Sequence, residues 1–457
     1  MTKKNETKQA FHESAERSEM GKALRVQVPR ADHGKWQPVP DRRDPIDLLE
    51  ESNLDRVPDL IPIRYGRMLE SPFAFLRGSA ALMAYDLATT PTSGIRVQVC
   101  GDCHLGNFAF YATPEQNLFF DINDFDETLF APWEWDVKRM AASFVVAGRA
   151  SHISDRDCEA VVHILARSYR TRLREYAEMR VLDTWYACID DKKLIATADD
   201  AKARQNRERS SDKARASMTK FLYPKITGVV DGRRRLDEQP PLIYHLPADS
   251  DSKERLNRMF AAYHDTQLAH LRRLFDRYRL MDFAFKVVGV GSVGTRCYVA
   301  LFLADVKDPL FLQIKQARAS VLEPYAGNSE YDHNGQRIVV GQHLMQSASD
   351  IFLGWTTGDD GRHYYLRQLR DRKYSVLPDN HEPKEMARYA DACGWALARA
   401  HAKGGDAAMV SGYLGQSDAF DQALGRFAVA YADQNAADYK ALKQAVNSGR
   451  VQAVVGK

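Results

Sequence analysis

The sequence predicts an α+β protein with a larger helical part and a smaller β-rich part. Apolar residues recur at helical spacing before residue 97, between about 130 and 280, and again in 376–457. Residues 281–375 instead hold short runs of aromatic and β-branched residues, which favour strands. A chain of 457 residues exceeds what one hydrophobic core usually organises, so we expect more than one packed unit.

Composition excludes several classes of protein. A net charge of +3 is too small to indicate nucleic acid as a partner. Six cysteines, four of them isolated, do not form a disulfide framework. No apolar run is long enough to span a membrane, and the first 20 residues lack the apolar core of a secretory signal. We therefore expect a cytoplasmic protein with reduced thiols and no membrane partner.

The first 96 residues divide into two segments. Residues 1–45 are polar, charged and proline-containing, which predicts a disordered arm. Residues 46–96 predict helices, because Phe73, Leu76 and Met83 fall on one helical face.

Residues 97–280 begin with the stretch richest in chemistry, Val97–Glu127, which carries six acidic side chains. A short strand leads into a polar turn with Asp102, His104 and Asn107, and a second strand delivers Asp124 and Asp126. Carboxylates and an amide at strand ends are typical of sites that hold a hard cation beside a reacting group. The alternative is a pair of surface turns rich in Gly, Asn and Asp.

The remainder of 97–280 predicts helices. One follows Pro132, a second is capped by Asp155, and a third runs from about Asp251 to Leu280. The charged stretch 190–215 fits a solvated helix or a mobile connection.

A glycine-rich turn falls within the β-rich segment 281–375. Its glycines, Gly289, Gly291 and Gly294, with Ser292 between the last two, match G-x-G-x-x-G. A dinucleotide site needs a helix directly after the third glycine, whereas here a strand follows. A strand, glycine-rich turn and strand instead form the flap that covers a triphosphate in kinase-like proteins, where backbone N–H groups approach the phosphates. A plain glycine-rich hairpin is the alternative.

Lys315 lies inside the next predicted strand, LFLQIKQA. An interior lysine is costly there unless its ammonium group finds anions. The phosphates of a nucleotide would supply them, with Glu323 or Gln342 as a partner for the side chain. Each of these residues also fits an ordinary surface position.

Residues 376–457 predict helices, one ending at Gly404-Gly405.

Cys100, Cys103 and His104 also match the C-x-x-C-H pattern of haem attachment. Covalent haem attachment requires export, for which we see no signal. No second cysteine pair completes a zinc site. We therefore do not expect haem or structural zinc.

Together these motifs resemble the kinase-like phosphotransferase superfamily, nearest to aminoglycoside and choline kinase-type enzymes, and more closely the bacterial family DUF2252. GDCHLGNF is similar to the superfamily's H-G-D-x-H-x-x-N catalytic loop, with Cys100 in place of its first His. The resemblance implies a two-lobed fold with a β-rich nucleotide lobe (281–375) and a helical catalytic lobe completed by residues 376–457. It implies ATP and Mg²⁺ as cofactors.

The resemblance also implies roles for individual residues. Asp102 would be the catalytic base or hydroxyl-orienting carboxylate, with His104 in the same loop and Asp136 bracing its backbone. Metal ligation would fall to Asn107 and Asp124, assisted by Asp126. The phosphates would be bound by the set Gly289, Gly291, Ser292, Gly294, Lys315 and Glu323.

Chain order departs from the superfamily, because the flap and its lysine follow the catalytic loop by about 180 residues. A circular permutation reconciles the two orders, since the helix ending at GWALARAHAKGG is similar to the one that normally precedes the loop. We expect phosphoryl transfer to a hydroxyl of an acceptor that the sequence does not identify. A nucleotide-binding pseudokinase and an AMP-transferring enzyme are the alternatives.

Overall fold

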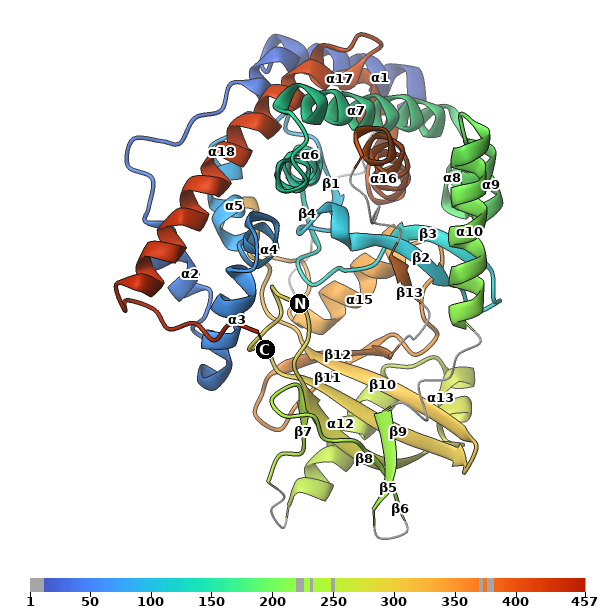
Figure 1. The fold of residues 1–457 in the computed structure, drawn as a ribbon. Helices are drawn as coiled ribbons and strands as arrows, with labels where there is room; N and C mark the ends of the chain where they lie inside the picture. The colour runs from blue at the N-terminus through green and yellow to red at the C-terminus, as the bar shows by residue number, and fades with distance from the viewer. Residues whose placement is uncertain are drawn as a thin grey trace, which may run out of the picture.

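The computed structural model describes residues 12–218, 226–230, 233–247, 251–369, 373–375 and 382–456. An α+β arrangement is observed: a helical region forms the upper part of the view in Figure 1, and a sheet region forms the lower part. Among the described residues, no helix is long and apolar enough to cross a membrane.

The sheet region is built on six antiparallel strands in the order β11-β12-β10-β9-β8-β7. Lys315, near the end of β10, pairs with Cys297 on β9 and with Tyr365 on β12. The lysine therefore sits on an interior strand, as predicted. The strands are β7 (Ile243–Tyr244), β8 (Arg279–Lys286), β9 (Cys297–Asp305), β10 (Asp308–Gln316), β11 (Gly354–Thr357) and β12 (His363–Gln368).

Two helices, α12 (Ser252–Asp265) and α13 (Ala269–Phe275), cover one face of this sheet. The hairpin of β5 (Thr227–Val230) and β6 (Arg233–Leu236) adds to the other face. From sequence, this segment is expected to belong to the helical part, with one helix that extends to Leu280. The structure differs because Tyr263 and Phe275 bury their rings against strand residues, and β8 already begins at Arg279.

The helical region is organised around α6 (Trp133–Ala150), which is buried on nearly every side. A helix that is buried all round needs apolar neighbours on each face. They come from α7 (Asp155–Glu178), α16 (Pro383–Gly404) and α18 (Ala419–Asn447). Ser154, rather than Asp155, caps α7, because its hydroxyl accepts the Asp157 N–H.

The stretch 97–132 crosses the base of the helical region as two small sheets. β1 (Arg96–Val99) pairs with β4 (Leu129–Pro132), and β2 (Phe108–Ala112) lies between β3 (Leu118–Ile122) and β13 (Lys373–Ser375). Val97 also forms an antiparallel bridge to Gly405, directly after α16. Helix α15 (Asn334–Met345), with the short α14 (Glu323–Ala326) before it, lies between the two regions.

The predicted disorder of residues 1–45 is wrong for the described part, 12–45. Helix α1 (Ser14–Ala23) packs along α17 (Ala407–Leu414), and Trp36 is buried against Phe427 and Tyr431 of α18. The packing of α1 and the burial of Trp36 order this segment, although its composition is polar. Residues 1–11 lie outside the described residues. Four short helices follow: α2 (Pro45–Glu51), α3 (Ile61–Met68), α4 (Pro72–Gly78) and α5 (Ala80–Leu87).

The charged stretch 190–215 forms α9 (Asp191–Ala196) and most of α10 (Ala201–Met218). With α8 (Val181–Tyr186), these helices stand at the edge of the helical region, and α10 is largely exposed where its side chains are described. The solvated-helix reading of this stretch is therefore confirmed.

Candidate functional site

The turn after β1 is held by the first turn of α6. Asp136 accepts hydrogen bonds from the Cys100 N–H at 2.7 Å and the Gly101 N–H at 2.9 Å. His401 Nε2 lies 3.3 Å from the same carboxylate. Gly101 has φ +83° and lies directly against the Glu127 carbonyl, where a Cβ would not fit. Asp136 therefore holds the backbone of the loop through two hydrogen bonds.

Asp102 projects from this turn and is engaged by Arg139. Arg139 Nε donates to Asp102 Oδ1 at 2.6 Å, and a second guanidinium nitrogen contacts the same oxygen. The Asn107 amide donates to the Asp102 carbonyl at 2.6 Å. Sequence reasoning missed Arg139, although it lies three residues after Asp136 on one helix and so shares its face.

His104 is buried beside Asp102 and is held neutral. Its Nδ1 accepts the Gly106 N–H at 3.1 Å, and its Nε2 lies 3.9 Å from Asp102 Oδ2. Burial, together with the charges of Arg77 and Arg139, lowers the pKa of His104 to about 4 against the pull of Asp102. His104 therefore shapes the turn as an uncharged acceptor.

Lys315 meets the acidic segment that follows β3. Its Nζ lies 2.5 Å from Asp126 Oδ2 and 3.9 Å from Asp124 Oδ1. Burial opposes its charge, but the two carboxylates raise the pKa of Lys315 well above its usual value. The lysine is thus a charged group with only 4% of its side chain exposed.

Asp126 differs from Asp124 in its surroundings. Tyr365 Oη donates to Asp126 Oδ1 at 2.6 Å, while Lys315 and the Ser292 hydroxyl both reach Oδ2. Protein donors therefore engage both oxygens of Asp126, which ties the loop to the sheet. Asp124 is more exposed, at 38% of its side chain, and it lines the cavity described below.

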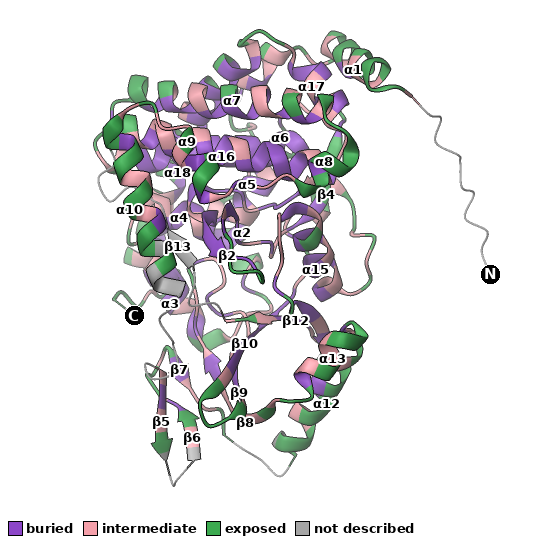
Figure 2. Cartoon of the chain, turned by 90° about the vertical axis from the view of Figure 1, so that its right-hand side faces the viewer, coloured by how far each residue is buried: buried purple, intermediate pink, exposed green. Residues whose placement is uncertain are grey.

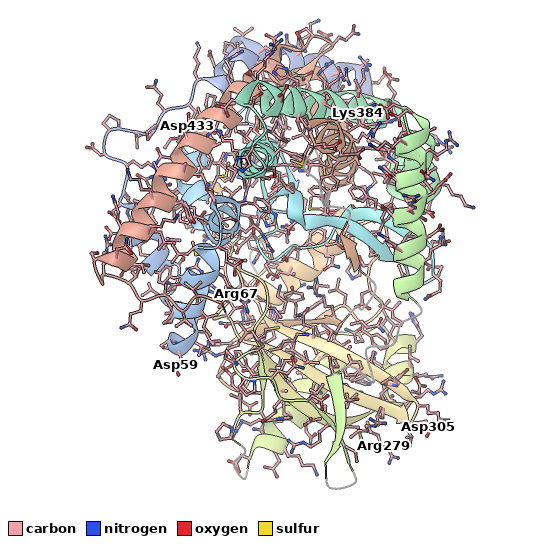
Figure 3. The ribbon with its side chains drawn as sticks, in the orientation of Figure 1. Asp59, Arg67, Arg279, Asp305, Lys384 and Asp433 are labelled. Carbon is pink, nitrogen blue, oxygen red and sulfur yellow. The ribbon has the colours of Figure 1, made fainter. Side chains whose placement is uncertain are left out.

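The glycine-rich turn joins β8 to β9 and rests on the N-terminal helices. Gly289 and Gly294 have positive φ values of +66° and +85°. A Cβ on Gly291 would lie 2.9 Å from the Arg77 carbonyl, so the turn approaches α4 closely. The Val57 N–H donates to the Gly294 carbonyl at 2.7 Å, and Arg67, labelled in Figure 3, reaches the Gly289 carbonyl from α3.

Glu323 is not brought to Lys315, contrary to its predicted role. Its carboxylate accepts the Ser320 N–H at 3.0 Å and lies 3.8 Å from Arg337 Nε. The short helix α14 turns it back on its own connection. Gln342, the other candidate, donates at 2.8 Å to Gln346, which caps the C-terminus of α15. Lys315 is instead paired with Asp126 and Asp124.

These elements enclose one cavity of about 340 Å³ between the helical and sheet regions. Its lining brings together the predicted residues Asp102, His104, Asn107, Asp124, Asp126, Gly289, Gly291 and Ser292. The structure also places four unpredicted arginines in the wall, namely Arg56, Arg64, Arg77 and Arg318. Carboxylate and amide side chains, the glycine-rich turn and cations therefore meet at one cavity.

Cys100 and Cys103 lie beside Asp136, with candidate ligand atoms within 4.8 Å of one another. Burial raises the pKa of the Cys103 thiol to about 11 and sets that of Cys100 well above its usual value. Both are therefore neutral thiols that pack behind the loop, and all six cysteines of the chain are free. Asp136, already bonded to two N–H groups, is committed to the loop.

Fold and site define an α+β protein with an acidic, arginine-walled cavity below a glycine-rich turn. The chain belongs to the family described as "Uncharacterized protein conserved in bacteria (DUF2252)", whose profile matches residues 56–445. Comparison with curated proteins and with solved structures found no match in either set.

Proposed function

We propose that this protein is an ATP- and Mg²⁺-dependent phosphotransferase with a two-lobed, kinase-like fold in circularly permuted order. One observation carries the proposal: Asp102, Asn107, Asp124 and the glycine-rich turn line a single cavity, and Lys315 contacts Asp124 and Asp126 at its edge. Phosphoryl transfer depends on positioning and charge rather than on covalent chemistry, and these residue types supply both.

The order of parts in the sheet region supports a nucleotide lobe. A glycine-rich turn connects two antiparallel strands, and the lysine lies on the third strand, as in protein kinases. The departure is the lysine's partner, because Lys315 meets Asp126 and Asp124, whereas in a kinase a glutamate on a helix pairs with the lysine.

The contact between α16 and β1 supports the permutation. Gly404 and Gly405, which end α16, lie against Gln98 and Val97 of β1. The helix that would lead into the catalytic loop in an ordinary kinase therefore ends beside that loop's strand. In this chain, α16 and β1 are neighbours in space but are not joined directly by the chain.

The donor set of the cavity fits Mg²⁺, which prefers carboxylate and amide oxygens. Asp124 would hold it together with Asn107, whose amide is fixed by its nitrogen so that Oδ1 is the ligating atom. Bound Mg²⁺ would neutralise phosphate charge. Lys315 positions the phosphates, the backbone of the glycine-rich turn covers them, and Asp102 orients the acceptor hydroxyl and accepts its proton.

The test measures both the binding of Mg²⁺-ATP and the transfer of its γ-phosphate. Mg²⁺-ATP raises the melting temperature of the protein, because a ligand specific for the native state stabilises it. Asp102→Asn retains this shift but loses transfer of label from γ-labelled ATP by roughly a hundredfold or more. A folded wild-type protein that neither shifts nor transfers would contradict the proposal, as would loss of both properties in Asp102→Asn.

A nucleotide-binding protein that transfers nothing is the second candidate, and the Arg139–Asp102 pair favours it. Two guanidinium nitrogens of Arg139 contact Asp102 Oδ1, so one oxygen of the carboxylate is already engaged before any acceptor binds. Binding of Mg²⁺-ATP without single-turnover transfer of either γ- or α-phosphate label would establish this candidate. Transfer of the α-label alone would indicate AMP transfer.

A further inference from the structure

Four arginines line the same cavity as the carboxylates. Arg56, Arg64 and Arg77 come from the N-terminal segment, and Arg318 follows β10. The glycine-rich turn is bonded to this segment, because Arg56 reaches the Val293 carbonyl and the Gly291 backbone lies against that of Arg77. The arginines therefore form a fixed wall of the cavity, called here the arginine wall.

Three of the four members of the arginine wall lack an acidic partner among the described residues. Buried arginines elsewhere in the chain are paired: Arg170 with Asp421 and Arg399 with Asp121. In the part of the chain that the structure describes, no ion pair joins Arg56, Arg64 or Arg77 to a carboxylate, and the first two donate to carbonyl or amide oxygens.

Two donors of the wall are left without a partner. Arg64 Nε and Arg77 Nε are buried and have no hydrogen-bond acceptor among the described residues. Arg318 reaches the Ser52 carbonyl at 3.2 Å, and its Nε lies 4.0 Å from Asp55 Oδ2. Buried donors of this kind are costly unless a ligand or water satisfies them.

The charges of the wall also repel one another. Burial and the neighbouring charges of Arg64 and Arg318 set the pKa of Arg56 well below its usual value, and burial lowers that of Arg64 to about 10. Such crowding of cations is relieved by an anion, and arginine favours planar, bidentate binding of phosphate and carboxylate.

We infer that the arginine wall binds an oxyanion, of the phosphate class, carried by the acceptor. This inference rests on the proposed function. Lys315, the glycine-rich turn and Asp124 already provide for the nucleotide's phosphates. Arg77 instead stands near His104 in the loop of Asp102, and its charge acts on that histidine. An acceptor anchored there by its anion presents a hydroxyl to Asp102.

Inorganic phosphate is the probe, and thermal unfolding of the full chain is the readout. Phosphate raises the melting temperature of the wild type above that in chloride of equal ionic strength. Arg77→Gln weakens the apparent affinity for phosphate on the order of tenfold or more, because a charge-assisted bond is lost. Arg77 has no described ion pair to lose, so the variant folds, and its response to Mg²⁺-ATP matches the wild type. Arg180→Gln, at an exposed surface pair, is the control and leaves both responses unchanged.

Saturating Mg²⁺-ATP separates the two sources of the anion. Additive shifts support an acceptor site, whereas loss of the phosphate shift would place the nucleotide's own phosphate on the arginines and overturn the inference. No phosphate response in the wild type, or an equal response in Arg77→Gln, would also overturn it. An Arg77-dependent phosphate response without any Mg²⁺-ATP response would contradict the proposed function but not the anion site.

Discussion

His104 illustrates how a single environment decides the role of an ionisable side chain. From sequence it belongs to the chemistry of the loop, next to Asp102. In the structure it is closed off from solvent, its Nδ1 accepts the Gly106 N–H, and the pKa of His104 falls to about 4. A group that stays neutral through the physiological range is a poor proton shuttle at pH 7 but a good fixed acceptor.

The lowered pKa of His104 makes stability depend on pH. The unfolded chain, in which a histidine has a pKa of about 6.5, binds the proton more readily than the native state. The contribution of His104 is complete above pH 6.5 and is lost as pH falls towards 4. We expect it to account for roughly 2–3 kcal/mol of the unfolding free energy lost between pH 7 and 4.5.

Urea unfolding at the two pH values measures this loss. His104→Gln keeps an acceptor near Gly106 and removes the titrating group, so it loses less stability on acidification than the wild type. His270→Gln, an exposed position, serves as the control and loses as much as the wild type. An equal loss in His104→Gln would show that the proton is taken up elsewhere.

At the scale of elements, the loop 100–107 depends on one close approach of backbones. Gly101 contacts the Glu127 carbonyl, and Glu127 in turn accepts the Val321 N–H at 2.8 Å. The Ser320 hydroxyl also donates to the Glu127 carbonyl at 2.8 Å. The loop, the acidic segment and the connection after β10 are thus locked together through Gly101 and Glu127.

Gly101→Ala is expected to destabilise the protein by about 3 kcal/mol or more, because a left-handed residue and a backbone clash coincide. Gly94→Ala is the matched control. It has a similar φ, +82°, but no atom within 4 Å of the added Cβ, so it costs only about 1 kcal/mol. Chemical denaturation compares the two, and equal losses would mean that the contact with Glu127 yields without cost.

Helices, strands and turns that depend on residues close together in the sequence were predicted well. The strand–turn–strand around Gly291 and the helix ending at Gly404-Gly405 lie where expected, because alternation, helical period and turn glycines act over a few residues. Glu323 was misassigned because a short helix, invisible in composition, turns its carboxylate towards Ser320. The arginine wall was missed because its members are scattered from residue 56 to 318 and converge only in the fold.

At the scale of the whole molecule, the N-terminal segment is fastened to the C-terminal helices. Arg42 donates to Asp86 on α5 and to Asp438 on α18, at 2.7–2.9 Å. All three side chains are less than 10% exposed. Near the C-terminus of the chain, the Val454 N–H donates to the Pro62 carbonyl at 2.8 Å. The segment that carries most of the arginine wall is therefore held in place by the end of the chain.

Removal of Arg42 should loosen this attachment. Arg42→Met leaves two buried carboxylates without their cation, so we expect a loss of about 3 kcal/mol or more in the unfolding free energy. Arg43→Met, one residue on, removes an exposed pair with Glu51 and should change nothing measurable. Equal stability of the two variants would show that the Arg42 cluster is compensated by its surroundings.

The bridge between Val97 and Gly405 has a consequence for how the protein is made. The two residues are about 300 positions apart in the chain, yet they are neighbours in space. At a synthesis rate of 5–20 residues per second, the ribosome takes roughly 15–60 s to add that length. Strand β1 therefore lacks its contact with α16 until nearly the whole polypeptide has been synthesised.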